Sequence, residues 1–396
     1  MIGPEHLPTR QDGVPARRRR VVVVTGSRAD FGLLRPVMRA VRDHAELELL
    51  VIAAGSHLVP PAETFRDVRA EFEVADSIPM QVAGRTTRAD DAEAVGKGAA
   101  RFARSFAGSQ PDWVVVLGDR IEVLAAASAA SVGGWPIAHI HGGDRAEGIA
   151  DEAIRHAVTK LAHVHLAATP GSAERIVRMG ERADCVHVVG SPAVDDLADL
   201  APMRDAAYAD LGQPQVVMLL HPLGRSSEQE EHVASMVLEG LASLRVLALE
   251  PNHDPGREGI VRAIRLAGEQ REDLRTAGHM PRSAFVGLLK RLARGGDRGA
   301  SAGVLVGNSS AGLIECAALG CPVVNVGARQ AGREYGPNVI HVGEVAEAIR
   351  TAIARAMMLT LDPRRHPYGD GFAGRRIADV LARTDGGLLL RKRCAY

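Results

Sequence analysis

The chain alternates between short apolar, β-branched runs and helix-length segments, a pattern that very few folds accept. The runs predict strands at Arg20 to Thr25, Leu47 to Ala53, Trp113 to Leu117, Ile137 to Ile140, Val164 to Ala168, Cys185 to Val189, Val216 to Leu220, Ser243 to Leu249, Gly303 to Val306 and Pro322 to Asn325. Most runs are apolar at successive positions, so we expect helices on both faces of the sheet. The pattern is typical of parallel α/β proteins.

The segments between the runs have helical spacing of their apolar residues. They predict helices at Leu33 to His44, Ala89 to Phe106, Ile121 to Val132, Asp151 to Leu161, Ala173 to Met179, Glu228 to Ala242, Ala284 to Arg294, Gly312 to Leu319 and Val345 to Met358. Most predicted strands end in a polar or glycine-rich turn, such as TGSRAD, LGDR, HGGD, LLHP and VGNSSAG. In an open α/β sheet such turns line the crevice that binds ligands.

The segment DDLADLAPMRDAAYADLGQP, Asp195 to Pro214, has prolines but no strand pattern and falls halfway along the chain. It predicts a linker between two doubly wound, Rossmann-like α/β domains that face a central cleft. The predicted division is a disordered tail over 1–20, a first domain over 21–200, a second domain over 201–364, and a part over 365–396 whose helix, Arg375 to Ala382, crosses back to the first domain. One large sheet is the alternative.

The charges of the chain balance, with 48 Lys and Arg against 48 Asp and Glu in 396 residues. Nucleic acids and anionic membranes select an excess of positive charge on one face, so we expect neither as a partner and look for a ligand in a pocket. A hydrophobic fraction of 46% and a charged fraction of 24% are typical of a globular protein and exclude a wholly disordered chain.

Targeting and cysteine patterns point to the cytoplasm. No apolar run approaches the roughly 18 residues that cross a bilayer. Only Val21 to Val24 separate the arginines at 17–20 from a polar stretch, which is too short for a secretory signal. The cysteines form no CxxC pair and predict neither a disulfide framework nor a structural zinc site: Cys185, Cys316, Cys321 and Cys394.

Two turns are candidates for phosphate binding. The turn VGNSSAG places four polar or small residues between a strand and a helix, where N–H groups, hydroxyls and the helix dipole favour an anion: Asn308, Ser309, Ser310 and Gly312. Ordinary helix capping by the serines is the alternative. In TGSRADFG, Arg28 is placed to reach a diphosphate across the cleft, unless it pairs with Asp30. Neither turn has the P-loop or the GxGxxG pattern.

Carboxylates gather after neighbouring predicted strands. Asp119 follows one strand in LGDR, and Asp144 follows the next in HIHGGD. Asp151 opens the helix DEAIRH, with Arg155 one turn later on the same face. Grouped carboxylates raise one another's pKa values and so supply proton donors and acceptors. For each of them alone, a helix cap or a solvated turn residue is the alternative.

Histidines allow two further hypotheses. HIH places two rings on one face of a strand, and four histidines are candidate zinc ligands: His139, His141, His163 and His165. A zinc ion would consume the carboxylates as ligands and no cysteine joins them, so we expect no metal. His221, in LLHPLG, is predicted to face the cleft near the serine turn as a hydrogen-bonding cation or acid, with a structural histidine as the alternative.

An ordered set of motifs over about residues 21 to 385 resembles the UDP-N-acetylglucosamine 2-epimerases, and most of all their hydrolysing branch. These motifs are TGSRADFG, GDRIE, HIHGGD, GIADEAIRHAVTKLAH, GSPAVDDL, HP, PNHDPG, HMPRSAFVGLLKR and VGNSSAGLIECAALGCPVVNVGARQAGREYGPNVI. The resemblance implies a GT-B-like pair of Rossmann domains, UDP-N-acetylglucosamine and UDP as ligands, no cofactor, and a homodimer.

The resemblance also implies roles for individual residues. Asp119, Asp144 and Asp151 match acid-base positions of the family, and His221 matches a histidine beside the leaving diphosphate. Arg120 and Arg155 are interpreted as residues that orient the carboxylates. Further substrate contacts are implied around the diphosphate, the ribose and the uracil: Arg28, Ser309, Ser310 and Gly312 for the first, Glu315 for the second and Phe285 for the third.

The implied reaction is an anti elimination of UDP to a 2-acetamidoglucal, followed by hydration to N-acetylmannosamine. Many relatives carry Glu at the position of Asp144, which shortens this side chain by one methylene. Either the sugar sits closer or Asp144 has only an electrostatic role. The alternatives are a non-hydrolysing epimerase that returns UDP-N-acetylmannosamine, a GT-B glycosyltransferase, and a non-catalytic nucleotide-sugar sensor.

Overall fold

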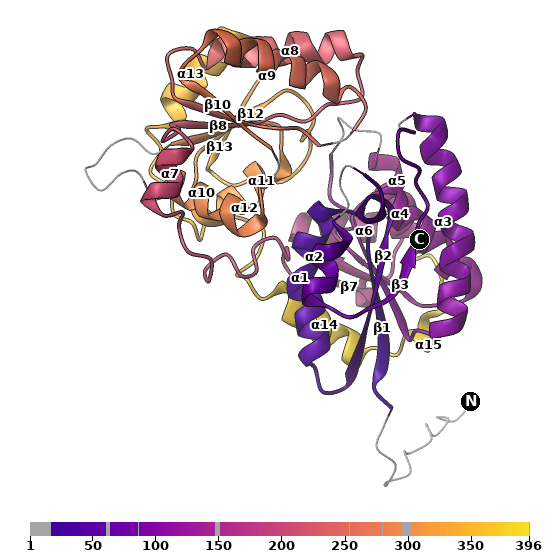
Figure 1. The fold of residues 1–396 in the computed structure, drawn as a ribbon. Helices are drawn as coiled ribbons and strands as arrows, with labels where there is room; N and C mark the ends of the chain where they lie inside the picture. Colours follow the sequence, from indigo (N-terminus) through magenta and orange to yellow (C-terminus); the bar gives the residue numbers. More distant parts are fainter. Residues whose placement is uncertain are drawn as a thin grey trace, which may run out of the picture.

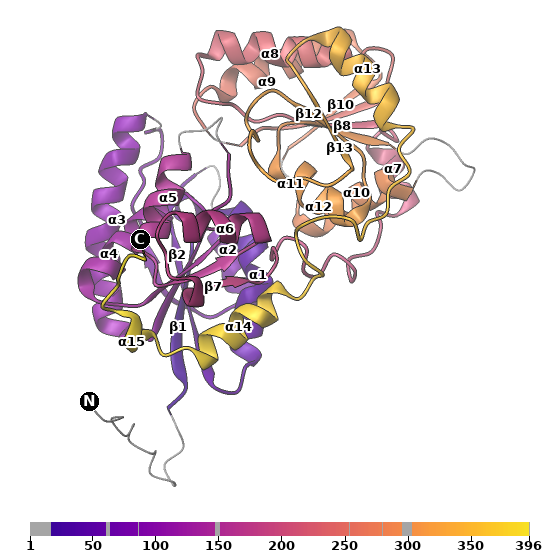
Figure 2. The same ribbon diagram turned by 180° about the vertical axis from the view of Figure 1, so that it is seen from behind.

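The computed structural model describes residues 17–60, 64–85, 87–146, 151–252, 254–278, 280–294 and 303–395. They form two α/β domains, each built around a parallel sheet (Figures 1 and 2). The alternative of one large sheet is therefore wrong. Most of the predicted tail over 1–20 lies outside the described residues, and the first strand already begins at Arg19, whose backbone N–H donates to the carbonyl oxygen of Glu46.

The first sheet has the strand order β3-β2-β1-β4-β5-β6-β7. Its strands are β1 (Arg19–Thr25), β2 (Leu47–Ala54), β3 (Val74–Ile78), β4 (Trp113–Leu117), β5 (Ile137–Ile140), β6 (Val164–Ala167) and β7 (Val186–Val188). Its helices are α1 (Arg28–Asp43), η1 (Gly55–Leu58), α2 (Phe65–Glu71), α3 (Arg88–Ser109), α4 (Ile121–Gly133), α5 (Asp151–Leu161), α6 (Pro170–Arg178) and η2 (Ala183–Cys185). The order reverses between β1 and β4, where such sheets open a crevice at their C-terminal ends.

The second sheet has the strand order β10-β9-β8-β11-β12-β13 and reverses between β8 and β11. Its strands are β8 (Val216–Leu219), β9 (Val246–Leu249), β10 (Leu274–Ala277), β11 (Val304–Gly307), β12 (Val323–Val326) and β13 (Val339–Val342). Its helices are α7 (Asp205–Asp210), α8 (Ser227–Gly240), α9 (Arg257–Gln270), α10 (Arg282–Arg294), α11 (Ser310–Leu313), α12 (Glu315–Leu319) and α13 (Ala346–Ala356).

Three strands have no counterpart among the predicted ones, and all three lie at sheet edges: β3, β10 and β13. The middle of β3 is exposed at Ala75, Asp76 and Ser77, and β10 is exposed at Arg275 and Thr276. An edge strand has a single neighbour and faces solvent, so it does not need the continuous apolar run that marks a central strand.

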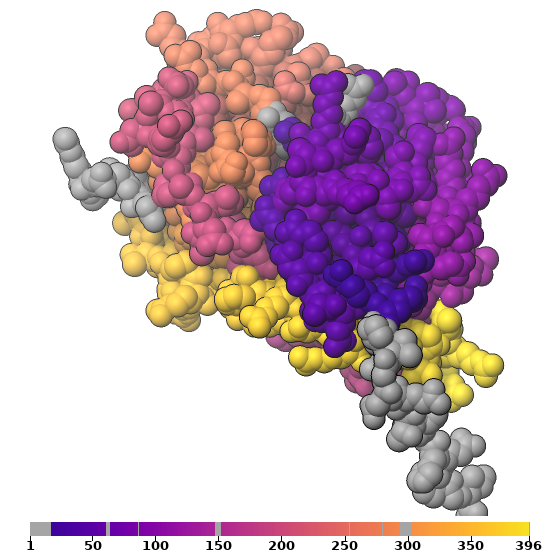
Figure 3. Space-filling model, turned by 60° about the horizontal axis from the view of Figure 1, so that its bottom comes forward, coloured from indigo at the N-terminus to yellow at the C-terminus, as the bar shows by residue number. Residues whose placement is uncertain are grey.

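The chain returns to the first domain through α14 (Ala373–Arg383), which is followed by α15 (Gly386–Leu389). Ile377 and Leu381 of α14 are buried in the same core as α1 and β1. The carboxylate of Asp195 accepts hydrogen bonds from the N–H groups of Ala373 and Gly374, at 2.9 and 2.7 Å. Figure 3 shows the C-terminal part, in yellow, running across both domains.

A small apolar cluster joins the two domains beside this crossing. Ala168 of the first domain and Val286 and Ile314 of the second are buried in it together with Val194 and Tyr368. Burial of these side chains stabilises the domain contact by removing apolar surface from water. Among the described residues, no helix combines the length and the apolar character that crossing a bilayer takes.

Candidate functional site

Asp119 and Arg155 form the centre of a partly buried charged cluster in the first domain. Asp119 follows β4, and Arg155 lies one turn into α5. The Arg155 guanidinium contacts the Asp119 carboxylate, and its Nη1 donates to the backbone oxygen of Asp144 at 3.0 Å and to Glu152 at 3.2 Å. Burial, with the charges of Arg333 and Arg329, lowers the pKa of Arg155 to about 9, so the group stays charged at neutral pH.

Asp144, after β5, is 3% exposed and has partners on both carboxylate oxygens. Oδ2 lies 2.8 Å from Nδ1 of His141, and Oδ1 accepts a hydrogen bond of 2.8 Å from the hydroxyl of Ser172. Nη2 of Arg333, from the second domain, lies 3.8 Å from Oδ2. Burial alone would raise the pKa of Asp144, but these partners outweigh it and lower the pKa to about 2.

Asp151 is the first residue of α5. Its backbone therefore lies one helical turn before Arg155, as the i,i+4 spacing predicts. The side chain of Asp151 and the residues at 147–150 lie outside the described part of the chain. The backbone alone places Asp151 in the cluster region.

His221 and Asn308 are joined at the C-terminal ends of β8 and β11. The His221 N–H donates to Oδ1 of Asn308 at 2.7 Å, and Nδ2 of Asn308 donates to the His221 carbonyl oxygen at 2.8 Å. The N–H of Asn252 donates to Nδ1 of His221 at 3.2 Å, so neutral His221 carries its proton on Nε2. The Asn308 side chain thus holds the backbone of His221 in place.

The helix that follows the turn VGNSSAG is shorter than the sequence predicts. Ser309 caps α11 by accepting a hydrogen bond from the Ala311 N–H at 3.4 Å, and α11 ends at Leu313. The dipole of so short a helix is smaller than the predicted segment Gly312 to Leu319 would supply. A Cβ on Gly312 would lie 2.9 Å from Cγ1 of Val323, so this glycine permits close packing on β12.

The remaining predicted contacts lie in three places. Arg28, at the start of α1, lies 3.8 Å from Asp67 and not beside Asp30, whose carboxylate caps the same helix. Glu315 is buried and accepts a hydrogen bond of 3.0 Å from Arg282. Phe285 on α10 is half-buried against the core of the second domain. The structure therefore brings Asp119, Asp144 and Arg155 together, and separately His221 and Asn308.

The four histidines of the metal hypothesis have separate partners. His139 contacts the Gly118 carbonyl oxygen, His163 accepts from the Ile137 N–H, and His165 lies 3.1 Å from Glu181. Burial lowers the pKa of His139 to about 3, so this ring is neutral. Across the described ranges, no group of three His, Cys, Asp or Glu residues is arranged to hold a metal ion.

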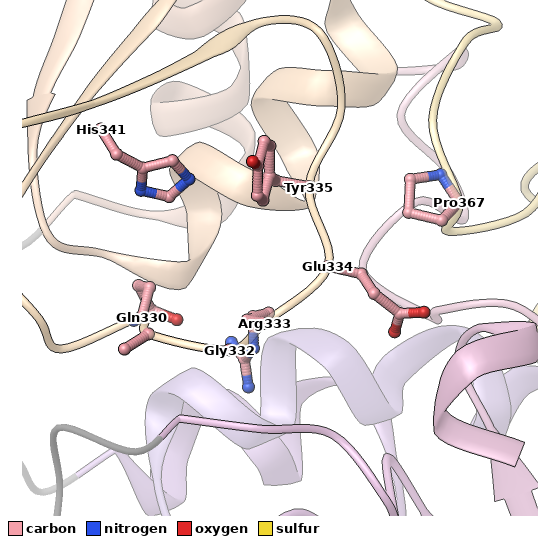
Figure 4. Close-up of a pocket in the computed structure, with 8 residues that line it drawn as sticks. Gln330, Gly332, Arg333, Glu334, Tyr335, His341 and Pro367 are labelled. Carbon is pink, nitrogen blue, oxygen red and sulfur yellow. The ribbon is translucent and has the colours of Figure 1, made fainter. Parts of the chain in front are cut away.

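The loop between β12 and β13 carries none of the predicted site residues, although its segment GARQAGREYG is part of the family resemblance. This loop lines a pocket of about 650 Å³ (Figure 4) with Gln330, Ala331, Gly332, Arg333, Glu334 and Tyr335, together with His341 and Pro367. Nε of Arg333 donates to the backbone oxygen of Arg145 at 3.2 Å, and Nη2 of Arg175 donates to Glu334 at 3.0 Å. The only signal in the sequence is the density of charged residues between glycines.

Comparisons of sequence identify one family. A sequence profile described as UDP-N-acetylglucosamine 2-epimerase matches residues 39–382. A Legionella pneumophila protein named UDP-N,N'-diacetylbacillosamine 2-epimerase (hydrolyzing) is 33% identical over 372 residues, 92% of this chain and 95% of that protein. A Neisseria meningitidis protein named UDP-N-acetylglucosamine 2-epimerase is 30% identical over 349 residues, 86% of this chain and 88% of that protein.

The fold is similar to that of the Methanocaldococcus jannaschii UDP-GlcNAc 2-epimerase, solved in complex with UDP-GlcNAc and UDP. The TM-score is 0.75 at 17% identity, covering 92% of this chain and 100% of that chain. The predicted pair of Rossmann-like domains in a GT-B-like arrangement is confirmed. The chain belongs to the UDP-N-acetylglucosamine 2-epimerase family.

Proposed function

We propose that this chain is a hydrolysing UDP-N-acetylglucosamine 2-epimerase, which converts UDP-N-acetylglucosamine and water into UDP and N-acetylmannosamine. Family membership supports the epimerase chemistry, and the name of the L. pneumophila relative supports the release of UDP. The observation that carries the proposal is the partly buried cluster of Asp119 and Arg155 beside Asp144, at the point where the two domains meet.

The reaction takes two proton transfers at carbon 2 of the sugar. In the elimination, a base removes the proton from carbon 2, the C–H electron pair becomes the double bond to carbon 1, and the C1–O bond breaks with its electrons leaving on UDP. In the hydration, water adds its hydroxyl to carbon 1 and a proton reaches carbon 2 from the opposite face. We assign the two proton transfers to Asp119 and Asp151, with Arg155 orienting Asp119 through its contact.

The second domain is proposed to hold the nucleotide. His221, with its proton on Nε2, is a donor to the departing diphosphate, and the hydroxyls of Ser309 and Ser310 are donors beside it. Asn308 and Gly312 support this wall through the His221 backbone and through packing. The outer nucleotide contacts are assigned as the family resemblance implies, with Arg28 toward the diphosphate, Glu315 toward the ribose and Phe285 toward the uracil.

A second candidate substrate is UDP-N,N'-diacetylbacillosamine, because the L. pneumophila relative is named for it. This sugar has two acetamido groups, one of them at carbon 2 as in UDP-N-acetylglucosamine, so the same elimination and hydration apply. The two substrates differ at carbons 4 and 6, away from the proton transfers. Both candidates are therefore tested with the same protein and the same assay.

The deciding experiment incubates the purified protein with each UDP-sugar in deuterated water and follows the products by NMR. We expect free UDP together with a 2-epimerised sugar that carries deuterium at carbon 2. Epimerisation without release of UDP would identify a non-hydrolysing epimerase instead. Release of UDP with an unlabelled, unepimerised sugar would contradict the elimination route.

A further inference from the structure

The loop between β12 and β13 of the second domain contacts the first domain through two adjacent residues, Arg333 and Glu334. Glu334 lies at the N-terminal end of α6, where its carboxylate accepts hydrogen bonds from Arg175 at 3.0 Å and from Thr169. A Cβ on Gly171 would lie 2.0 Å from Oε1 of Glu334, so a larger residue at position 171 would displace this carboxylate. The hydroxyl of Tyr368 donates to the Glu334 backbone oxygen. Glu334 is thus held through its side chain by α6 and through its backbone by Tyr368.

Arg333 reaches the acid cluster from the same loop. Its side chain is 11% exposed and points toward the first domain in Figure 4. Nε donates to the backbone oxygen of Arg145 at 3.2 Å, and Nη2 lies 3.8 Å from the Asp144 carboxylate. Gly332 has a φ of 75°, in the left-handed region that favours glycine, and a Cβ there would lie 2.7 Å from Nε of the Arg145 side chain.

Each oxygen of the Asp144 carboxylate has a hydrogen-bond partner. Ser172 has a single hydroxyl proton, and its Oγ lies 2.8 Å from Asp144 but 3.3 Å from Glu334, so it donates to Asp144. His141 fills the second oxygen at 2.8 Å, and the charge of Arg333 faces the same oxygen. A carboxylate that is 3% exposed and hydrogen-bonded on each oxygen is held in place by the protein and is poorly placed to take a proton from a sugar carbon.

We propose that Asp144 is a positioning residue that receives Arg333, and that this pair, together with Glu334 on α6, holds the second domain's loop against the Asp119–Arg155 cluster. The proposal rests on the proposed function and deepens it. Of the two roles considered for Asp144, contact with a closer sugar or an electrostatic role, the proposal selects the electrostatic role. The positive charge of Arg333 then lies beside the cluster when carbon 2 loses its proton.

The test compares Arg333→Gln, Asp144→Asn and the double variant in the full-length chain, with steady-state turnover of the UDP-sugar and UDP binding by calorimetry. We expect each single variant to lower kcat by about 10-fold to 100-fold, the scale of a slightly misplaced reacting group. The UDP dissociation constant should change by less than about threefold. The kcat of the double variant should lie within about twofold of the kcat of the slower single variant, because the two residues act through one contact.

Three further readouts separate positioning from proton transfer and from simple structural support. Arg333→Lys keeps the charge and should recover part of the lost kcat. The pH profile of kcat for Asp144→Asn should keep both limbs of the wild-type profile, since the proton carriers remain. Arg364→Gln is the matched control, because Arg364 is exposed and pairs with Asp362 on the surface. It should match the wild type in kcat.

Several outcomes would overturn the proposal. Loss of one limb of the pH profile in Asp144→Asn would make Asp144 a proton carrier. Additive losses in the double variant would show that the two residues act separately, and unchanged kcat with a raised KM in Arg333→Gln would show substrate binding alone.

Failure of the proposed function is recognised separately from failure of this inference. If the proposed function is wrong, the wild type turns over neither UDP-sugar. Amide hydrogen exchange at α6 can still be compared between the wild type and Glu334→Gln. Faster exchange in the variant is expected if Glu334 holds the loop on α6, and equal exchange rates would refute this contact. Wild-type turnover combined with normal kcat in both single variants would refute the inference alone. Circular dichroism melting identifies any variant that fails to fold, and Arg333→Lys then carries the test.

Discussion

Asn308 and His221 hold each other by a reciprocal pair of hydrogen bonds, at 2.7 and 2.8 Å, that joins the ends of β8 and β11. Asn308 is 1% exposed, so its amide serves the backbone of His221. Asn308→Ala removes both side-chain partners and leaves the partly buried N–H and C=O of His221 without them. We expect a loss of about 2 to 3 kcal/mol in the free energy of unfolding, measured by urea denaturation.

The matched control for this prediction is Ser309→Ala in the same turn. Its capping hydrogen bond to the Ala311 N–H is long, at 3.4 Å. We therefore expect a loss of about 0.5 kcal/mol, at the low end for a helix cap. Equal losses in the two variants would show that the reciprocal pair contributes no more than an ordinary cap.

Asp119→Asn tests the proposed proton transfer. The variant keeps the shape of the side chain but removes the charge that contacts Arg155. We expect turnover to fall at least about 100-fold, the scale of a general acid-base group, with little loss of UDP binding in calorimetry. Asp151→Asn should behave in the same way.

The control for these variants is Asp76→Asn, at an exposed position of the edge strand β3. It should match the wild type in turnover. Equal damage to UDP affinity and to turnover in Asp119→Asn would place this residue in the nucleotide pocket and contradict its assignment.

Glu122 makes stability depend on pH. It is fully buried on α4, in space that Gly26 and Gly55 leave open, since a Cβ on Gly26 would lie 2.6 Å from its Cγ. Burial raises its pKa against the opposing charge of Arg120. In the unfolded chain Glu122 loses its proton near its usual pKa of about 4.3, while the folded chain keeps the proton to higher pH. Stability from this group therefore falls as the pH rises above about 4.3.

The Gln side chain of Glu122→Gln cannot ionise, so the variant does not lose stability from this group as the pH rises. We therefore expect the free energy of unfolding of the variant, relative to that of the wild type, to be higher at pH 7 than at pH 4. Urea denaturation of both proteins at both pH values measures this. Glu269→Gln, an exposed change on α9, is the control and should stay within about 0.5 kcal/mol of the wild type. A difference that does not vary with pH would show that folding leaves the pKa of Glu122 unchanged and would contradict the prediction.

Gly374 sets the distance between α14 and α1. A Cβ at this position would lie 2.8 Å from the carbonyl oxygen of Pro36. Gly374→Val forces the helices apart and should lower the free energy of unfolding by about 2 to 3 kcal/mol, as overpacking does. Arg375→Ala, on the exposed side of α14, should change it by no more than about 0.5 kcal/mol. Thermal unfolding of both variants checks this, and equal melting temperatures would contradict it.

The central strands of both sheets could be predicted because they are buried on both faces and so consist of continuous apolar runs. The edge strands β3 and β10 could not, since solvent accepts polar residues along them. Within the site, the proximity of Asp119 and Asp144 could be predicted from the turns after β4 and β5, because neighbouring parallel strands end at the same edge.

The partners of individual side chains could not be predicted in the same way. The spacing in TGSRADFG suggests Asp30 as a partner of Arg28, but Arg28 lies 3.8 Å from Asp67, which is on α2. Asp30 instead accepts from backbone N–H groups of its own turn. Such choices depend on which segment packs nearby, which spacing along the chain does not report.

By itself the sequence determined the α/β class, the two domains, the family and the turns that carry the carboxylates, because these follow from local periodicity and from the order of motifs. Only the tertiary structure decided that Asp144 is enclosed by His141, Ser172 and Arg333, and that Glu334 binds α6. Arg333 and Asp144 are far apart in the chain. Their contact depends on how one folded domain packs against another, and no local pattern in the sequence records that geometry.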